Sequence, residues 1–124
     1  MDIIISNSSG KPIYEQVESQ IKNLIITGAL HEGDALPSMR LLAKELRISV
    51  ITTKRAYEDL ERDGFIESVP GKGSFVAAKN PDFLREEHMR IAEKHLKEAV
   101  DLAKISGVTM RELCEIIEML YEEE

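Results

Sequence analysis

Cysteine, tryptophan and long apolar runs are scarce or missing in this sequence of 124 residues. It contains no tryptophan and one cysteine, Cys114. A single cysteine excludes an internal disulfide framework, and its apolar neighbours indicate a small packed residue on a helix face. No segment approaches the roughly 18 consecutive apolar residues of a membrane span, and residues 1–7 lack the basic start of a secretory signal. We therefore expect a cytoplasmic protein that does not contact a membrane.

The motifs of common enzyme classes are also missing. The sequence has no repeated cysteine and histidine spacing, no glycine-rich phosphate loop and no nucleophile elbow. His88 and His95 share one predicted helix face near Glu87 and Glu98, but two helical turns separate them too far for one mononuclear metal site. A metal there would need a partner subunit, so we expect surface histidines, no metal, no cofactor and no enzyme activity.

The net charge of −7 is distributed unevenly along the chain. Residues 1–36 carry −3, residues 37–79 carry +2 and residues 80–124 carry −6. The stretch from residue 37 to residue 57 has one acidic side chain, Glu45, and five basic ones: Arg40, Lys44, Arg47, Lys54 and Arg55. Phosphate contact depends on the potential within roughly 8 Å, so a basic segment can bind nucleic acid on an acidic chain.

Residues 36–63 have the pattern of a helix-turn-helix. A first helix, opened by Lys11-Pro12-Ile13-Tyr14, supplies the support and ends at Gly28. Ser38 caps the next short helix, whose buried side we assign to Leu41, Leu42 and Leu46. Ser49 caps a third helix, which buries residues at helical spacing: Thr53, Ala56, Tyr57 and Leu60. This spacing leaves a set of side chains free to enter a major groove: Val50, Ile51, Thr52, Lys54 and Arg55.

Two β-prone runs follow directly, at residues 65–69 and 74–77. The four residues between them, Pro70-Gly71-Lys72-Gly73, predict a hairpin with a basic and flexible tip. A helix-turn-helix followed by such a hairpin is a winged helix. The fold class is thus mainly α with a small β-hairpin wing, and the winged helix-turn-helix domain covers residues 1–79.

Three blocks in order resemble the DNA-binding domain of the GntR family of bacterial transcription regulators. They are Leu36-Pro37-Ser38-x-Arg40-x-Leu42-Ala43, then Thr52-x-x-x-Ala56-Tyr57-x-x-Leu60-x-x-x-Gly64-Phe65-Ile66, then Gly71-x-Gly73-Ser74-Phe75-Val76. The resemblance implies that DNA is contacted by Arg40, by the opening of the third helix and by the wing tip at the minor groove. The candidate DNA-binding residues are Ser38, Arg40, Ser49, Val50, Ile51, Thr52, Lys54, Arg55, Gly71, Lys72 and Gly73.

One position departs from the family pattern. Many members have arginine directly after the cap serine, where this chain has Val50, followed by Ile51. The change removes a bidentate reader of guanine and leaves an apolar contact, such as one to a thymine methyl. Simpler interpretations stay open for the basic residues, because Arg40 and Lys44 could be solvated and Lys72 could be an ordinary turn residue.

The last 45 residues, 80–124, predict two further helices. Asn80-Pro81-Asp82 breaks the chain, a helix runs from about residue 83 to 106, and Thr109-Met110-Arg111-Glu112 matches a capping box that starts the last helix. Their apolar stripes need a partner surface, and the segment is too short to enclose a ligand chamber. We assign a dimerisation surface to Leu96, Ala99, Leu113, Ile116, Ile117 and Leu120.

A two-helix tail of this kind resembles the YtrA subfamily, whose members dimerise through a short helical C-terminal region. The resemblance implies a homodimeric, sequence-specific repressor that binds a palindromic operator and controls neighbouring transporter genes. The alternative is a winged-helix protein-interaction adaptor without operator specificity. An unknown small-molecule effector remains open as a partner, although Met89, Met110 and Met119 are better interpreted as core residues.

Overall fold

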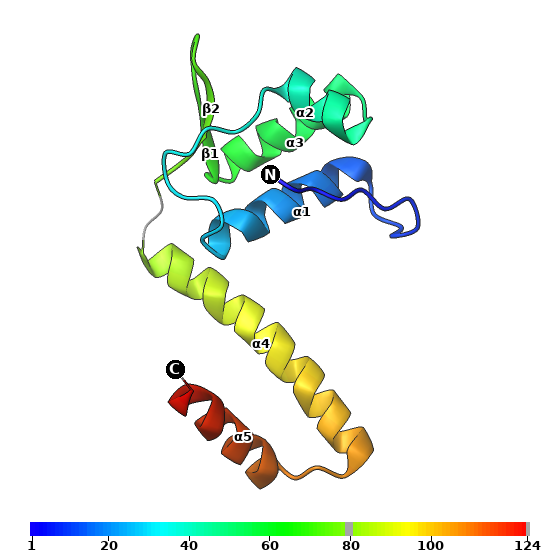
Figure 1. Cartoon of the computed structure of the whole chain (residues 1–124), viewed down its shortest axis with the longest axis vertical. Helices are drawn as coiled ribbons and strands as arrows, with labels where there is room; N and C mark the ends of the chain where they lie inside the picture. Colours follow the sequence, from blue (N-terminus) through cyan, green and yellow to red (C-terminus); the bar gives the residue numbers. More distant parts are fainter. Residues whose placement is uncertain (79–80, 124) are drawn as a thin grey trace. The chain divides into compact units, whose positions relative to one another are not determined.

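The computed structural model describes residues 1–78 and 81–123 and divides into two compact units, Met1–Leu84 and Arg85–Glu124. It is mainly helical, with one two-stranded sheet (Figure 1), so the predicted fold class is confirmed. The boundary expected between residues 79 and 80 lies outside the described residues. The elements are α1 (Ile13–Ile26), α2 (Met39–Leu46), α3 (Val50–Arg62), β1 (Ile66–Val69), β2 (Gly73–Val76), α4 (Pro81–Ser106) and α5 (Met110–Glu122).

The core of the first unit forms where α1 packs against α3. Pro12 stands at the N-cap of α1, where its missing N–H leaves no helix bond unmade. The helical spacing of α1 buries Val17 and Ile21 completely. The predicted buried face of α3 is confirmed, with exposure of 2 % or less at Thr53, Ala56, Tyr57 and Leu60. This packing holds one face of α3 inside the unit and leaves the opposite face outside.

The buried side of α2 differs from the predicted one at Leu41, and the predicted Leu46 is only half-buried. Leu42 and Ala43 are buried, whereas Leu41 is 48 % exposed. The helix has eight residues and packs one face on α3, and Leu41 lies one position away from Leu42 and points to the other side. The assignment of Leu41 to the buried side was therefore wrong, because Leu42 and Leu46 lie four positions apart on one helix face and Leu41 is turned about 100° away from Leu42.

The turn between α2 and α3 is held by backbone bonds. The Ile48 N–H donates to the Ala43 carbonyl over 3.0 Å, and Arg47 takes the left-handed conformation with φ of 58°. This is the usual way for a helix to end before a sharp change of direction, although arginine is an uncommon residue for it. The tight break predicted between the two helices is thus present.

The wing is an antiparallel hairpin in which Ile66 pairs with Val76 and Val69 with Gly73. At its tip, the Lys72 N–H donates to the Val69 carbonyl over 2.9 Å, and Gly71 has φ of 75°. Pro70 followed by a glycine with positive φ fits a type II turn. The preceding connection also joins the sheet, because an isolated bridge links Ala35 to Phe75. This pairing was not predicted, since the segment around Ala35 reads as turn-rich.

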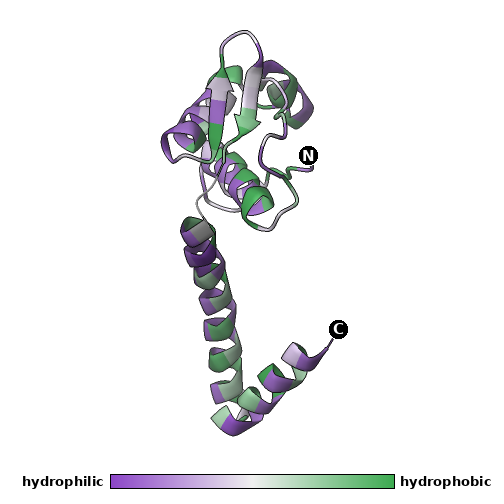
Figure 2. Ribbon diagram, turned by 90° about the vertical axis from the view of Figure 1, so that its left-hand side faces the viewer, coloured by the Kyte–Doolittle hydropathy of each residue, from purple (hydrophilic) through white to green (hydrophobic). Residues whose placement is uncertain are grey.

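The second unit contains most of α4 and all of α5, which folds back from the end of α4 (Figures 1 and 2). Gly107 ends α4 with φ of 74°, and the Val108 N–H donates to the Ala103 carbonyl over 2.9 Å. The predicted capping box is confirmed, with Thr109 and Glu112 bonding to each other's backbone. No residue of α5 is buried within the single chain.

Candidate nucleic-acid interface

The start of α3 is fixed by its cap. The Ser49 hydroxyl accepts a hydrogen bond from the Thr52 N–H over 3.0 Å and donates to Thr52 Oγ1 over 2.7 Å. Thr53 Oγ1, which is buried, donates to the Ser49 carbonyl over 3.1 Å. These bonds satisfy the cap and make the first turn of α3 a rigid platform for the side chains that leave it.

Four side chains of this turn and the next one reach solvent. Val50 is 45 % exposed and Ile51 is 81 % exposed, while Lys54 and Arg55 are exposed as well. Thr52 is half-buried and is engaged by the cap. The predicted opening of a recognition helix thus exists as a continuous face, and it combines two aliphatic side chains with two cations.

The two cations of α3 differ in how firmly they are held. The guanidinium carbon of Arg55 lies 3.8 Å from the centroid of the Tyr14 ring, which is a close cation–π contact between α3 and the start of α1. Lys54 has only a loose ion pair, 3.9 Å from Glu58, and both side chains are more than 60 % exposed. Arg55 is therefore positioned in advance, whereas Lys54 can exchange its partner for a phosphate at little cost. The Tyr14 contact was not predicted, because no spacing rule links these two residues.

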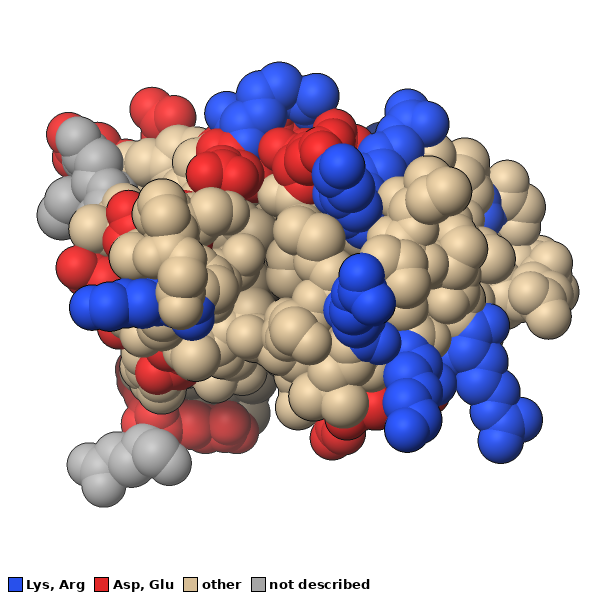
Figure 3. Space-filling model, turned by 90° about the horizontal axis from the view of Figure 1, so that it is seen from above, with Lys and Arg blue, Asp and Glu red and all other residues tan. Residues whose placement is uncertain are grey.

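Three further basic residues lie on α2 and at its C-cap. Arg40, Lys44 and Arg47 are exposed, and none makes an ion pair with another residue in the described part of the chain. Ser38 accepts a hydrogen bond from the Leu41 N–H over 3.1 Å, which caps α2. Figure 3 shows Lys and Arg side chains spread over the half of this face that lies above α2 and α3, with fewer acidic side chains among them. The local charge that the sequence suggests is present on the surface.

The wing carries the third group of candidates. Gly71, Lys72 and Gly73 are all exposed at the hairpin tip. A Cβ atom added at Gly71 or Gly73 would meet nothing within 4 Å, so these glycines are suited to the turn by their positive φ rather than by crowding. All three sets of predicted DNA-binding residues thus belong to one unit, on α2, α3 and the wing.

A carboxyl pair lies behind the exposed face of α3. Burial and a hydrogen bond to Asp59 raise the pKa of Glu18, on α1, from 4.5 to about 7. The same hydrogen bond lowers the pKa of Asp59, which also forms a 3.0 Å ion pair with Arg62. The raised pKa means that Glu18 keeps its proton to a higher pH than a free carboxyl group, which reduces the repulsion between these two groups on α1 and α3. Because one partner is on each helix, only the packing of the unit creates this pair.

The second unit has an apolar groove between α4 and α5 with a volume of about 260 Å³. It contains all six predicted dimerisation residues. Leu96 and Ile116 are 50 % exposed, Ile117 is 38 % exposed and Leu120 is 58 % exposed, while Ala99 and Leu113 are half-buried. Figure 2 shows apolar residues along both helices. The groove is lined by Leu96, Ala99, Val100, Met110, Leu113, Cys114, Ile116, Ile117 and Leu120.

Several expected core residues are exposed in the single chain. Cys114 is exposed, and Met89, Met110 and Met119 are 58 %, 81 % and 65 % exposed. Their assignment to a core was wrong for the single chain, because Met89 lies on an exposed part of α4 and, among the described residues, none of α5 is buried. Two large apolar residues of α4 were also missed, namely Leu102 and Ile105, which are 64 % and 83 % exposed and lie off the predicted stripe.

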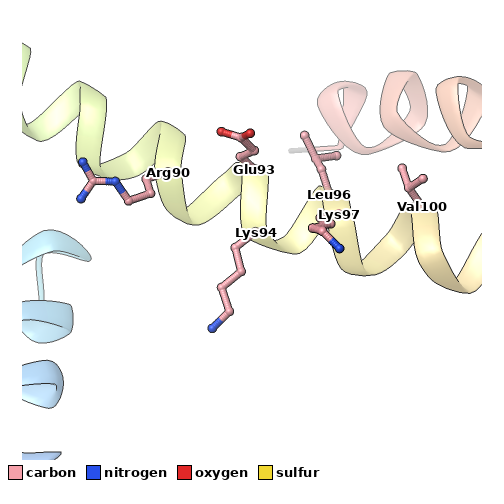
Figure 4. Close-up of a pocket in the computed structure, with 6 residues that line it drawn as sticks. All are labelled: Arg90, Glu93, Lys94, Leu96, Lys97 and Val100. Atoms are coloured by element: carbon pink, nitrogen blue, oxygen red, sulfur yellow. The ribbon is translucent and has the colours of Figure 1, made fainter. Parts of the chain in front are cut away.

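A second hollow on α4, shown in Figure 4, has a different character. It has a volume of about 490 Å³ and is lined by Arg90, Glu93, Lys94, Leu96, Lys97 and Val100. Its charged groups point in different directions, and Lys97 is paired with Asp101 over 3.2 Å. No polar groups converge there on one point. Across the residues that the structure describes, no three His, Cys, Asp or Glu side chains form a cluster that could hold a metal ion. The same residues include no helix that is long and apolar enough to span a membrane.

The fold and this surface define a winged-helix DNA-binding protein. Residues 13–76 match the family described as "Bacterial regulatory proteins, gntR family". The chain belongs to the GntR family, so it is a DNA-binding transcription regulator and not an enzyme. The resemblance that the three sequence blocks indicated is confirmed.

Individual relatives agree along most of the chain. The HTH-type transcriptional repressor YtrA of Bacillus subtilis is 36 % identical over 115 residues, which are 93 % of this chain and 88 % of YtrA. The crystal structure of a transcriptional regulator from Oenococcus oeni superposes with a TM-score of 0.72 at 27 % identity, and covers 94 % of this chain and 97 % of that one. The DNA-binding domain of AraR in complex with operator ORX1 has a TM-score of 0.55 at 28 % identity, and covers 62 % of this chain and 96 % of that one.

Proposed function

We propose that this protein is a homodimeric transcription repressor that binds a palindromic operator. Residues 1–79 would form the DNA-binding domain and residues 80–124 the dimerisation region. The observation that carries the proposal is the exposed basic face of α3 in a GntR domain that is followed by two helices with exposed apolar side chains, the second of which, α5, has no buried residue. The similarity to a protein named as a repressor, YtrA, supports the direction of control.

The proposed DNA contacts divide by chemistry. Arg40, Lys54, Arg55 and Lys72 neutralise phosphates, because they are exposed cations on the three elements that a winged helix turns toward a duplex. Ser38, Ser49 and Thr52 place short polar groups near the backbone at the helix starts. Gly71 and Gly73 let the tip approach the minor groove. The base edges then face Val50 and Ile51.

The proposed dimer uses the groove of the second unit. The stripe of α5 has no cover within the chain, and leaving several large aliphatic side chains in water forfeits about 0.8 kcal/mol for each methylene that a partner could bury. A second copy of the chain offers the same stripe in return, which makes a two-fold interface self-complementary. Two recognition helices related by a two-fold axis read two half-sites of an inverted repeat.

Location and targets follow from this proposal. We infer that the protein acts in the cytoplasm, where bacterial operators lie, and that its targets include transporter genes, as the resemblance to the YtrA subfamily implies. An effector, if the regulator responds to one, would be suggested by the products of the regulated genes. The selection experiment below identifies those genes directly.

The DNA-binding part is tested by selecting bound fragments from sheared and amplified genomic DNA of the source organism at moderate salt. We expect a small set of sites that share an inverted repeat. The double variant Arg40→Ala with Lys54→Ala should lose operator binding and lower the salt dependence by about two counterions per subunit. The control variant Arg90→Ala with Lys97→Ala removes the same charge from α4 and should bind normally. Enrichment without any sequence preference would refute operator recognition and favour the adaptor.

The dimer part is tested by sedimentation of the full chain at micromolar concentration. We expect a dimer for the natural sequence and for His95→Asp, which adds a carboxylate on an exposed polar position of α4. Leu113→Asp puts the same carboxylate in the apolar groove and should yield monomers, since a charge cannot be buried there without a partner. A monomeric natural protein, or a Leu113→Asp protein that remains dimeric, would contradict this role of the groove.

A further inference from the structure

One side chain on the exposed face of α3, that of Ile51, is aliphatic and makes no favourable contact with a phosphate. Ile51 is the second residue of α3 and is 81 % exposed. By helical periodicity it lies opposite the buried stripe that contains Thr53, Ala56 and Leu60, so it projects from the centre of the outward face. Packing within the unit gives it no role.

The surroundings of Ile51 are those of a side chain set between cations. Lys54 and Arg55 follow at the third and fourth positions, which are its neighbours on the helix surface. Arg55 is held by the Tyr14 ring, 3.8 Å away, and the first turn is held by the Ser49 hydroxyl. The aliphatic group therefore has a defined position, and the charges beside it match a polyanion and not an apolar protein surface.

The edges of DNA bases offer one group that fits an isoleucine. In the major groove, guanine, cytosine and adenine present hydrogen-bond donors and acceptors, and thymine adds the methyl group at C5. An aliphatic side chain cannot hydrogen-bond to the polar groups of the bases, and it displaces the water that would otherwise bond to them. The only favourable contact that it can make with a base edge is apolar contact with the thymine methyl group.

We infer that Ile51 contacts the C5 methyl of a thymine in each half-site of the operator. This inference rests on the proposed function, since it requires α3 to enter the major groove. Ile51 is then a specificity-determining residue, which favours thymine at one position of the half-site by apolar contact. The cations around it supply affinity that does not depend on sequence.

The inference is tested on the operator found by the genomic selection, with each thymine replaced singly by deoxyuridine. This exchange deletes the methyl and keeps every hydrogen-bonding group. Amplified DNA carries no 5-methylcytosine, so any methyl that is read belongs to thymine. Removing one buried methyl should weaken binding by about fourfold at one thymine per half-site, and by about 15-fold when both half-sites are changed.

Two variants separate this effect from general damage. Ile51→Ala should bind the normal operator less tightly and lose the distinction between thymine and deoxyuridine at that position. Ile4→Ala deletes the same atoms from a side chain that is 77 % exposed, beside α1, and should keep the distinction. Folding of both is checked by circular dichroism.

The outcomes identify which statement fails. If an operator is selected but no deoxyuridine changes its affinity, or if Ile51→Ala still distinguishes the two bases, the role of Ile51 is refuted and the proposed function stands. If no operator is selected at all, the proposed function and this inference fall together.

Discussion

The hydroxyl of Tyr57 joins two parts of the DNA-binding unit that are distant in sequence. It donates a 2.7 Å hydrogen bond to the carbonyl of Pro37, the residue just before the cap of α2, while the ring is 2 % exposed. Tyr57→Phe removes this one atom and keeps the ring. The Pro37 carbonyl is then left without its side-chain donor. We expect the free energy of unfolding to fall by about 1.5 kcal/mol, between the value of a net hydrogen bond and that of an unsatisfied buried acceptor.

The measurement is urea unfolding of the full chain, followed by circular dichroism at one protein concentration because a dimer adds a dependence on concentration. With a slope of about 1.5 kcal/mol/M, the midpoint should fall by about 1 M without a change of slope. Tyr14→Phe is the matched control. Its ring packs against Arg55 and keeps that contact as phenylalanine, so the midpoint should move by less than about 0.3 M.

Burial of the Tyr57 hydroxyl also predicts a dependence on pH. Burial, and then the nearby Glu45, raise the pKa of Tyr57 above its usual 10. The folded state thus holds the phenolic proton more tightly than the unfolded state, and stability should fall as the pH rises above about 10. Tyr57→Phe should remove this part of the alkaline loss. Equal midpoints for Tyr57→Phe and Tyr14→Phe would refute the argument, since the Pro37 carbonyl would then not depend on this donor.

Three further outcomes follow from the structure. Burial and Asp59 raise the pKa of Glu18, so the folded state binds this proton more tightly than the unfolded state and stability should fall as the pH rises from 4.5 to about 7. Glu18→Gln should make the urea midpoint nearly independent of pH across that range. An unchanged dependence of the midpoint on pH would count against the pair. Ser49→Ala should cost about 1 kcal/mol in the same assay, through loss of the cap bond to Thr52, whereas a change below 0.3 kcal/mol would mean that water replaces the cap. Gly71→Ala should cost about 1 kcal/mol from strain at φ of 75°, although no atom lies in its way, and a neutral result would show that the wing tip can adopt another turn.

Much of the fold could be predicted because it depends on near neighbours in the chain. Ser38, Ser49 and Thr109 each cap a helix with a bond to a residue three positions on, so sequence spacing alone locates the helix starts. Pro70 and Gly71 set the hairpin turn through their own backbone preferences. The order of these signals predicted a winged helix, and the resemblance of three sequence blocks to the GntR family indicated the family.

The wrong predictions of burial concern residues whose exposure depends on which other helix packs against them. Leu41 and Leu42 are adjacent leucines in one short helix, and only the direction of α2 against α3 leaves the first outside and the second inside. Cys114 was assigned to a packed helix face because its neighbours are apolar, and Met89, Met110 and Met119 were assigned to a core because they are apolar themselves, yet apolar character does not supply a covering layer. The sequence shows that α5 needs a cover, and the single chain does not provide one.

The sequence by itself determined the winged helix, its caps and its basic segment, because each is encoded by local spacing and side-chain chemistry, whereas the candidate DNA-binding residues rested partly on the resemblance to the GntR family. The tertiary structure decided how those residues are held. The contacts of Arg55 with Tyr14, of Tyr57 with Pro37 and of Glu18 with Asp59 join residues 20 to 41 positions apart. Such contacts arise only when helices pack, since side chains distant in sequence meet through the geometry of the whole unit and not through any local pattern.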